Sequence, residues 1–388
     1  MPGFEVFGEE ERKAINEIFE INGGIIFAHS FDAMRKGVYR VREFEAAFAK
    51  RMDIKYAQAV SSGSTALKTA LKALGIKRGD EVITTAFTFV ATVEAILECG
   101  ARPVIVDINE TLNISPECFE DAISSKTRAV IPVHMMGVSA QMDEIMYIAK
   151  RNNLKVLEDT AQGLGGTYKG RTLGTIGDMG AFSLDAGKTI ITGEGGMVIT
   201  SDQDLYIRAR SYHDHGHEYS STVGRGAEAA LITGFNYRMT ELQGAIGIVQ
   251  LGKLDMILAR QRENKKKLKG AISDLPIKFR TITDESGDLG DTIVFFLDTR
   301  EQAAKFVTKM AELGLGTKNL PDAIRWHFAK HWKHMFEEYN FYSDSYQIEW
   351  SKSADLLERA IALPVMVKME DSRIFEIADK IRKIHKEL

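Results

Sequence analysis

The chain has 388 residues, of which 44% are hydrophobic and 27% are charged, which suits one large soluble domain plus a smaller one, or two to three domains. Its formal net charge is −4 and no basic block occurs, which argues against binding to nucleic acid or to an anionic membrane surface. Cys99 and Cys118 lack metal-ligand spacing, and we predict no signal peptide or membrane span, so we expect a cytoplasmic protein without a metal site.

Strand-like and helix-like stretches alternate between residues 56 and 200. The helical stretches repeat apolar residues at i, i+3, i+4 and i+7, as Leu67, Ala70, Leu71 and Leu74 do. The expected strands are 56–62, 81–86, 102–108, 128–134 and 155–159, and the expected helices are 64–75, 89–100, 115–123 and 142–153. Such alternation predicts right-handed βαβ units and a mostly parallel sheet that is covered on both faces.

The rest of the chain is organised differently. Residues 180–184 and 196–201 have no long helix between them, which suggests neighbouring strands. Periodic Leu and Ile predict one long helix, or two, over 239–272. The remainder mixes strand-like and helical stretches. We therefore predict a large α/β domain over 1–250, with an N-terminal segment 1–34, and a smaller α+β domain over 251–388.

Ligands of parallel α/β sheets bind at the carboxyl ends of the strands, so the residues after each strand are the first candidates. The sequence SSGSTAL follows the first strand, where Gly63, Ser62 and Ser64 could bind a phosphate at a helix N-terminus, or the serines could simply cap the helix. Phe89 follows the second strand and could stack on a flat ring or pack in the core.

Two charged residues occupy similar positions. Asp159 ends a buried strand, where a carboxylate is unfavourable unless it has a partner such as a protonated ring nitrogen. Alternatively, Asp159 only caps a turn. Lys188 lies between two buried strands; it is either a solvated loop residue or an amine that can form a Schiff base with a carbonyl. A phosphate cradle, an aromatic face, a carboxylate and a lysine in one site are what a pyridoxal 5′-phosphate enzyme needs.

Several longer segments extend this prediction, namely SSGSTAL, GDEVITTAFTFVATVEAI, VHMMG, LEDTAQGLGG, GTIGDMGAFSLDAGKTIITGEGGM and GFNYRMTELQGAIG. Over essentially the whole chain they resemble the DegT/DnrJ/EryC1/StrS family of sugar aminotransferases. The resemblance implies the pyridoxal-phosphate transferase fold of type I, with a mostly parallel central sheet and a smaller C-terminal domain. Some relatives carry histidine in place of the lysine and dehydrate sugars, whereas this chain keeps Lys188, which favours transamination.

The resemblance also implies a role for individual residues. Lys188 would hold the cofactor and move the proton, Asp159 would pair with the ring nitrogen N1, and Phe89 would stack on the ring. Gln162 would lie near the ring's phenolic oxygen. The phosphate would bind to residues of the same chain and to one residue of a neighbouring subunit, which makes a homodimer with shared active sites the expected unit; these residues are Gly63, Ser64, Ser183 and, from the neighbour, Asn236.

A narrower similarity concerns the acceptor. MPGFEVFG, DHGHE at 214–218 and WHFAKHWKH at 326–334 resemble a branch of the family that aminates the C8 aldehyde of a 3-deoxy-octulosonate for lipopolysaccharide. His215, Arg325 and His327 are therefore candidates for binding a sugar carboxylate or hydroxyls, or they only make hydrogen bonds within loops. The small-domain segment 320–346 is expected to help choose the acceptor.

We therefore expect an aminotransferase that moves an amino group from an amino acid, with L-glutamate first, to a keto or aldehyde sugar. A nucleotide-linked 4-keto sugar or an aminocyclitol, with glutamine as donor, remains an alternative. A sugar dehydratase and a non-catalytic binding protein on the same fold also remain. A nicotinamide oxidoreductase is disfavoured because no GxGxxG follows the first strand.

Overall fold

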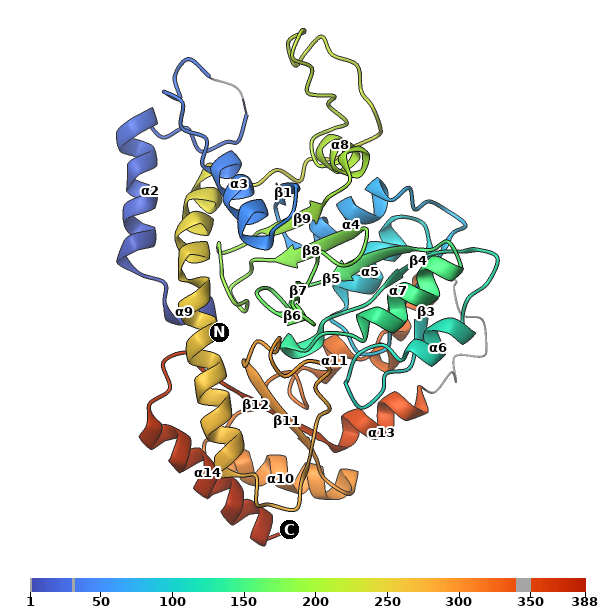
Figure 1. The fold of residues 1–388 in the computed structure, drawn as a ribbon, viewed down its shortest axis with the longest axis vertical. Coiled ribbons are helices and arrows are strands. Elements are labelled where there is room, and N and C mark those ends of the chain that lie inside the picture. The colour runs from blue at the N-terminus through green and yellow to red at the C-terminus, as the bar shows by residue number, and fades with distance from the viewer. Residues whose placement is uncertain (1, 30–31, 340–349) are drawn as a thin grey trace.

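The structure is a computed structural model that describes residues 2–29, 32–339 and 350–388. A seven-stranded sheet organises the first part of the chain, in the order β1-β9-β8-β5-β4-β2-β3 (Figure 1). Its strands are β1 (Tyr56–Val60), β2 (Glu81–Thr85), β3 (Arg102–Val106), β4 (Thr127–Ile131), β5 (Lys155–Asp159), β8 (Met179–Ser183) and β9 (Gly196–Thr200). Strand β9 runs antiparallel to both of its neighbours, and the other strands are parallel to one another.

Helices cover both faces of this sheet because successive side chains of each strand point to opposite faces. Ala181 of β8 packs in the core under α4, α5 and α8, and the next residue, Phe182, packs in the core under α3 and α9. The helices of this region are α1 (Pro2–Glu5), α2 (Glu9–Asn22), α3 (Arg40–Met52), α4 (Gly63–Ala73), α5 (Ala91–Glu98), α6 (Pro116–Asp121), α7 (Met142–Arg151), α8 (Gln203–Tyr212) and α9 (Glu241–Ala271), with a 3₁₀ turn at Met135–Gly137 and a hairpin of β6 (Thr167–Tyr168) and β7 (Arg171–Thr172).

A second, three-stranded antiparallel sheet lies at the other end of α9 (Figure 1). It consists of β10 (Lys278–Phe279), β11 (Thr292–Phe296) and β12 (Ala360–Pro364). The apolar side chains on one face of this sheet form a separate core with α10 and α14, and those on the other face, such as Val294 and Phe296, pack in a core shared with residues that follow β2. The helices here are α10 (Arg300–Glu312), α11 (Ile324–His327), α12 (Lys333–Glu338), α13 (Ser351–Arg359) and α14 (Asp371–Lys386), with a 3₁₀ turn at Ala329–His331.

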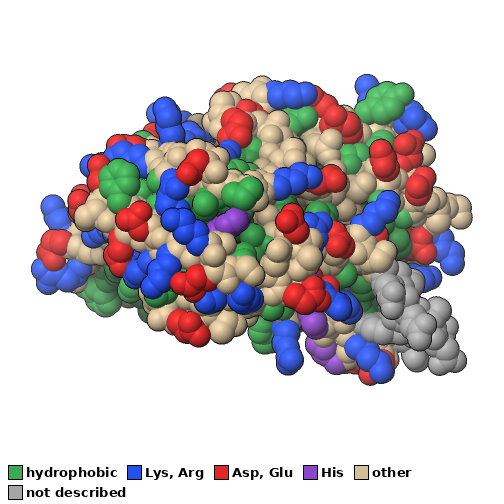
Figure 2. Space-filling view, turned by 90° about the horizontal axis from the view of Figure 1, so that it is seen from below, with side chains coloured by type: hydrophobic (Ala, Val, Ile, Leu, Met, Phe, Trp, Pro, Cys, Tyr) green, Lys and Arg blue, Asp and Glu red, His purple; other side chains and the backbone are tan. Residues whose placement is uncertain are grey.

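Helix α9 connects the two sheets. Thr240 caps its first turn by accepting a hydrogen bond from the N–H of Gln243. By length and composition this helix could cross a membrane, but half of its most apolar window is buried within the protein, and it packs on α2, α3 and α14. On the face shown in Figure 2, basic and acidic side chains of the described residues are interspersed.

The mostly parallel sheet, its βαβ units and the adjacent strands β8 and β9 confirm the fold predicted from the sequence. The long helical pattern is a single helix, α9, and not two. The predicted domain boundary after residue 250 stays a prediction, and α9 runs through that position without a break. The segment 325–334 forms parts of three short helical turns.

Candidate active site

A cavity of about 420 Å³ lies at the carboxyl end of the parallel strands. Side chains that follow β1, β2, β5 and β8 line it, because parallel strands bring their carboxyl ends to one edge of a sheet. Residues of the second sheet's domain close its other side. Of the residues predicted from the sequence, the following line the cavity: Gly63, Ser64, Phe89, Asp159, Gln162, Ser183, Lys188 and His327.

One end of the cavity is formed by the N-terminus of α4. The hydroxyl of Ser62 caps this helix and accepts a hydrogen bond from the N–H of Thr65 (3.1 Å), so the capping interpretation is confirmed for Ser62. Gly63 and Ser64 are the first two helical residues, and their N–H groups have no acceptor within the helix. With the nearby Ser183 hydroxyl they make a cradle of hydrogen-bond donors that suits a phosphate, and the helix dipole also favours an anion there.

Gly63 is required by its contact with β8. A Cβ atom at this position would lie 2.6 Å from Cβ of Ser183 and 3.0 Å from its hydroxyl oxygen. We expect Gly63→Ala to lower the free energy of unfolding by about 1–3 kcal/mol, because the first turn of α4 must move away from β8. The same movement should widen the cradle and weaken the binding of pyridoxal phosphate, which equilibrium titration of the apoprotein measures.

The matched control is Gly252→Ala on the exposed face of α9, where a Cβ meets nothing within 4 Å. This variant should leave cofactor affinity unchanged and should stabilise the protein by about 0.5–1 kcal/mol, because glycine is unfavourable inside a helix. Equal cofactor affinity in both variants would show that the cradle does not depend on the close packing of Gly63 on Ser183.

Asp159 is buried at the end of β5, with 3% of its surface exposed. Its carboxylate accepts hydrogen bonds from the hydroxyl of Thr92 (2.8 Å) and from the N–H of Ala161 (3.1 Å). Thr88 in turn donates to the hydroxyl of Thr92 (2.7 Å). Burial raises the pKa of the Asp159 carboxyl, and no Lys, Arg or His of the described residues forms an ion pair with it. A protonated ring nitrogen would supply the missing cation.

The preceding residue, Glu158, points to the opposite side of β5 and was missed by the sequence analysis. Its carboxylate accepts hydrogen bonds from the N–H groups of Gly174 (2.8 Å), Ile176 (2.6 Å) and Gly177 (2.7 Å). His134 donates from Nε2 to the same carboxylate (2.9 Å), because its Nδ1 accepts the N–H of Ala140 (3.1 Å). Two adjacent acidic residues in a buried strand were the available signal, since alternate residues must face opposite sides.

We expect Glu158→Ala to lower the free energy of unfolding by about 3 kcal/mol or more, because three backbone N–H groups and one imidazole lose a buried acceptor. Chemical denaturation measures the loss. Glu301→Ala is the control, since Glu301 is exposed, its one ion pair among the described residues is with its exposed neighbour Arg300, and its loss should change stability by about 0.5 kcal/mol or less. Similar stabilities of the two variants would contradict the structural role of Glu158.

Lys188 reaches the cavity from the connection between β8 and β9. Its side chain is 18% exposed, and its ammonium lies 3.5 Å from a carboxylate oxygen of Asp185. Asp185 is held by the N–H of Gly187 (2.6 Å) and accepts a weak hydrogen bond from Ser183 (3.4 Å). Lys188 is therefore a positioned residue of the cavity and not a solvated loop residue, and Asp185 is a neighbour that the sequence analysis did not identify.

An aromatic face and a histidine border the same space. Phe89 is 43% exposed, so it is not packed in the core, and its ring centroid lies 5.3 Å from that of His327. His327 donates from Nδ1 to the carbonyl oxygen of Ala323 (2.8 Å). Burial lowers the pKa of His327, so the neutral ring presents Nε2 as an acceptor. Gln162 accepts the N–H of Met136 (3.2 Å).

Three predicted residues do not line this cavity. Asn236 is exposed, and its backbone pairs with Asp214 in an extended bridge. His215 is also exposed and lies on the segment that projects beyond α8 (Figure 1). Arg325 is exposed in α11, next to the buried His327. Their predicted roles in binding remain predictions.

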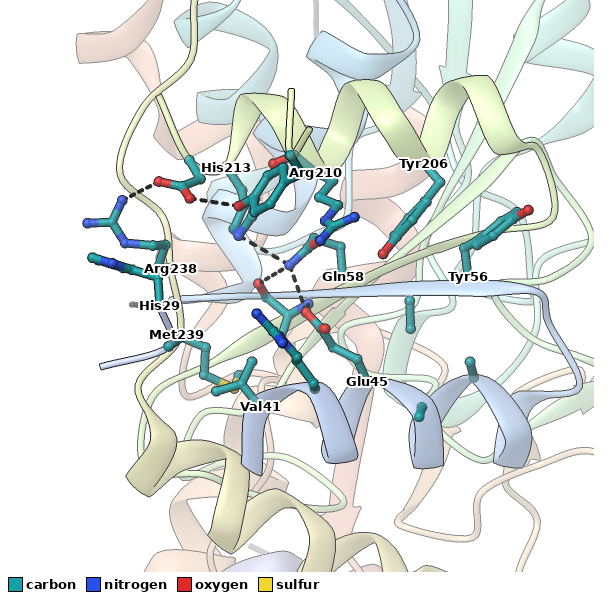
Figure 3. A pocket seen from close by; sticks show the side chains of 18 of the residues that line it. His29, Val41, Glu45, Tyr56, Gln58, Tyr206, Arg210, His213, Arg238 and Met239 are labelled. Carbon is teal, nitrogen blue, oxygen red and sulfur yellow. Dashed lines mark hydrogen bonds and ion pairs between the residues drawn. The ribbon is translucent and has the colours of Figure 1, made fainter. Parts of the chain in front are cut away.

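A larger cavity of about 630 Å³ lies between α3, β1 and α8, and Figure 3 shows its side chains. Glu45 accepts hydrogen bonds there from the amide of Gln58 (2.7 Å) and the N–H of Ala59 (2.8 Å), and Tyr56 stacks on Tyr206. None of the residues predicted to bind cofactor or substrate lines it. Cavity size alone would therefore have indicated a different place from the one where the predicted residues meet.

The smaller cavity fits pyridoxal phosphate because each part of the cofactor meets a matching group. The close packing of Gly63 on Ser183 holds the first N–H groups of α4 beside the Ser183 hydroxyl, which suits a phosphate, and the buried carboxylate of Asp159 forms no ion pair among the described residues. Lys188 places in the cavity an amine of the kind that covalent attachment of this cofactor needs. The fold and this cavity together define an enzyme of the pyridoxal-phosphate-dependent class with the type I fold.

Comparison with known proteins identifies the family. Residues 29–382 match the DegT/DnrJ/EryC1/StrS aminotransferase family. GDP-perosamine synthase of Escherichia coli O157:H7 is 35% identical over 354 residues, which cover 90% of this chain and 91% of that protein. The spore coat polysaccharide biosynthesis protein SpsC of Bacillus subtilis is 34% identical over 355 residues, or 89% and 90% of the two chains.

A solved structure agrees with this assignment. The aminotransferase from Psychrobacter cryohalolentis superimposes with a TM-score of 0.85 at 27% identity, over 98% of each chain. The chain belongs to the DegT/DnrJ/EryC1/StrS aminotransferase family, and it is a pyridoxal-phosphate-dependent aminotransferase. The family and the cofactor expected from the sequence are thereby confirmed.

Proposed function

We propose that this aminotransferase moves the amino group of L-glutamate to a keto or aldehyde sugar and so makes an amino sugar for a polysaccharide. The observation that carries the proposal is the meeting of Lys188, Asp159 and the phosphate cradle in one cavity. The names of two relatives, a GDP-perosamine synthase and a spore coat polysaccharide biosynthesis protein, support a sugar as acceptor.

The residues of the cavity divide the binding of the cofactor between them. Gly63, Ser64 and Ser183 bind the phosphate, Phe89 offers its exposed face to the ring, and Asp159 holds the proton on the ring nitrogen. When bound, pyridoxal phosphate supplies an aldehyde that carries the amino group between two substrates and a ring that withdraws electrons from the reacting carbon. Thr92 and Ala161 orient Asp159 for this pairing through their hydrogen bonds.

Lys188 has two tasks in the proposed reaction. Its amine would hold the cofactor and, once the donor has displaced it, would take the proton from Cα of the amino acid and pass it to the cofactor; in the second half-reaction it would take a proton back from the cofactor and give it to the reacting carbon of the acceptor. Asp185, 3.5 Å away, keeps the free amine within the cavity. His327 presents Nε2 as an acceptor for a substrate hydroxyl from the other side of the cavity.

A homodimer is part of the proposal. Asn236 is exposed and lies outside the cavity of its own chain, which suits contact with the cofactor phosphate of a second copy. Asn236→Ala should then weaken cofactor binding without any change inside the subunit that carries it. A mixture with an inactive Lys188→Ala partner tests this, because a shared site predicts partial recovery of activity in hybrid dimers.

The acceptor that we propose first is the C8 aldehyde of a 3-deoxy-octulosonate, the substrate of 8-amino-3,8-dideoxy-manno-octulosonate aminotransferase, which the DHGHE and WHFAKHWKH segments resemble. Of the three residues suggested for substrate binding, His327 lines the cavity, whereas His215 and Arg325 do not. Residues 340–346 of the segment expected to choose the acceptor lie outside the described residues. A nucleotide-linked 4-keto sugar is the second candidate, favoured by the 35% identity to GDP-perosamine synthase.

The test uses purified holoenzyme with L-glutamate or L-glutamine as donor and each acceptor class in turn. The expected result is loss of the visible absorbance of the lysine-bound cofactor on adding glutamate, its return on adding the acceptor, and an aminated sugar in the mass spectrum. A spectrum that no amino acid changes would contradict amino transfer. A product that has lost water without gaining nitrogen would indicate a dehydratase.

A further inference from the structure

The cavity contains a second lysine, Lys318, which none of the sequence motifs identified. Its backbone N–H donates to the carbonyl of Ala362 in β12 (2.9 Å), which fixes its position at the edge of the small sheet. Its ammonium forms an ion pair with Asp291, the residue directly before β11. Because both side chains line the cavity, Lys318 is a cation that the small domain holds toward the site of reaction.

The ion pair leaves hydrogen-bonding capacity free. Burial alone would raise the pKa of the Asp291 carboxyl, but the nearby ammonium of Lys318 lowers it below its ordinary value. The pair is therefore charged at neutral pH. Thr292 donates to the other oxygen of Asp291 (3.1 Å) and fixes the carboxylate. An ammonium has three N–H donors, and Asp291 uses one of them. Lys318 can therefore bind a second acceptor while the pair remains intact.

The acidic character of the cavity means that a substrate carboxylate needs a cation such as Lys318 to bind there. Among the described lining residues the acidic ones are Asp159, Asp185, Glu194 and Asp291, and the basic ones are Lys188 and Lys318. A substrate carboxylate that enters this acidic space loses water and meets repulsion unless it reaches a cation. Lys188 is needed for the cofactor, so Lys318 remains to bind the carboxylate.

A contact between domains places Lys318 near the cofactor residues. The next residue, Asn319, donates a hydrogen bond from its side-chain amide to Oε1 of Gln162 (3.4 Å). Gln162 lies shortly after Asp159, the last residue of β5. The loop that carries Lys318 is thus linked to the strand end that carries the partner of the ring nitrogen. A substrate held between the two domains would have its reacting carbon toward Lys188 and its carboxylate toward Lys318.

We propose that Lys318 binds a carboxylate of the substrates, held ready by Asp291. This inference rests on the proposed function, since it requires an amino-acid donor. In the first half-reaction the carboxylate is that of the donor. In the second it is that of the acceptor if the acceptor is a sugar acid, and a nucleotide-linked keto sugar would make no such contact.

The test compares three variants of the holoenzyme. Lys318→Met alone would leave Asp291 buried and unpaired, so the informative variant is the double exchange Lys318→Met with Asp291→Asn, which removes both charges. Asp291→Asn alone keeps the cation and breaks the pair. Lys330→Met is the control, because Lys330 is exposed, does not line the cavity, and among the described residues forms an ion pair with Glu358 alone, at 3.8 Å.

Dissociation constants for L-glutamate and 2-oxoglutarate are measured by titration of the cofactor absorbance and by calorimetry. We expect the double variant to weaken both by about 10- to 100-fold, with a higher KM and little change in kcat at saturation. Lys330→Met should bind them about as tightly as the unaltered enzyme, whereas Asp291→Asn, which keeps the cation but no longer holds it, should lose clearly less affinity than the double variant. A purely structural ion pair predicts equal losses in Asp291→Asn and in the double variant, since breaking the pair would then be sufficient.

The acceptor arm compares a 3-deoxy-octulosonate with a nucleotide-linked keto sugar. Weaker binding of the donor alone assigns Lys318 to the donor carboxylate, and weaker binding of the sugar acid as well assigns it to both substrates. Unchanged affinity for glutamate and for the sugar acid in the double variant would overturn the inference. If the unaltered enzyme responds to no amino acid, the proposed function fails instead, and the two failures are therefore distinguishable.

Discussion

Replacing Lys188 with alanine should lower kcat for amino transfer by about 10⁴-fold, the largest effect expected for any single residue of this protein. The lysine amine has both a covalent and a proton-transfer task. Asp185, which pairs with it on the same loop, is a carboxylate and so cannot replace the amine in the covalent task. Because Lys188 lies on the cavity surface and is not part of a packed core, the variant should fold normally and still bind pyridoxal phosphate through the cradle at α4.

Borohydride reduction followed by peptide mass spectrometry checks the covalent task directly. The unaltered holoenzyme should carry the cofactor's mass on the peptide with Lys188, and the alanine variant should carry none. Lys169→Ala is the control, since Lys169 is exposed and pairs with Asp143, and neither residue lines the cavity. Label on another lysine of the unaltered enzyme, or full turnover by Lys188→Ala, would remove Lys188 from the mechanism.

The part of the site that could be predicted from the sequence is the part that follows strands. Asp159 and Ser183 end parallel strands, and Gly63 and Phe89 come shortly after such strands. Since a parallel sheet brings these ends to one edge, the sequence order alone predicts that the side chains meet. The same argument found the fold, because alternating strands and helices of this length have few arrangements open to them.

The residues that sequence reasoning missed are those placed by contacts between distant segments. Lys318 and Asn319 reach the cavity because the small domain packs against the ends of the large sheet, and no local pattern predicts that packing. His134 is likewise defined by partners, Glu158 and Ala140, that a linear pattern does not connect. Arg325 and His215 were suggested by unusual local composition; neither lines the cavity of its own chain, so their roles in binding stay predictions.

Asp159→Asn should lower kcat by about 10²- to 10³-fold while the cofactor still binds. The asparagine has nearly the same shape and can accept the hydrogen bond from Thr92, but it cannot hold a proton on the ring nitrogen through an ionic pair. Retention of the phosphate contacts should keep cofactor affinity within reach of titration. The readout is single-turnover reaction with glutamate, in which full activity would contradict the role of Asp159.

Asp159→Asn lowers kcat, but at neutral pH it should raise the free energy of unfolding of the cofactor-free protein. Burial raises the pKa of the Asp159 carboxyl in the folded state. At pH values below its ordinary pKa of about 3.9, Asp159 is protonated in both the folded and the unfolded state and does not lower the free energy of unfolding. As the pH rises from there through the raised pKa of the folded state, the unfolded chain loses its proton first and the folded state is progressively destabilised.

Asparagine does not ionise, so the cofactor-free Asp159→Asn variant should be more stable than the unaltered apoprotein at pH 7, with the difference shrinking toward pH 4. Urea denaturation across this range measures it, and saturating pyridoxal phosphate should reverse the order, because only aspartate gains a cationic partner. A cofactor-free variant that is less stable at pH 7 would mean that Asp159 is already compensated within the protein, without need of the cofactor.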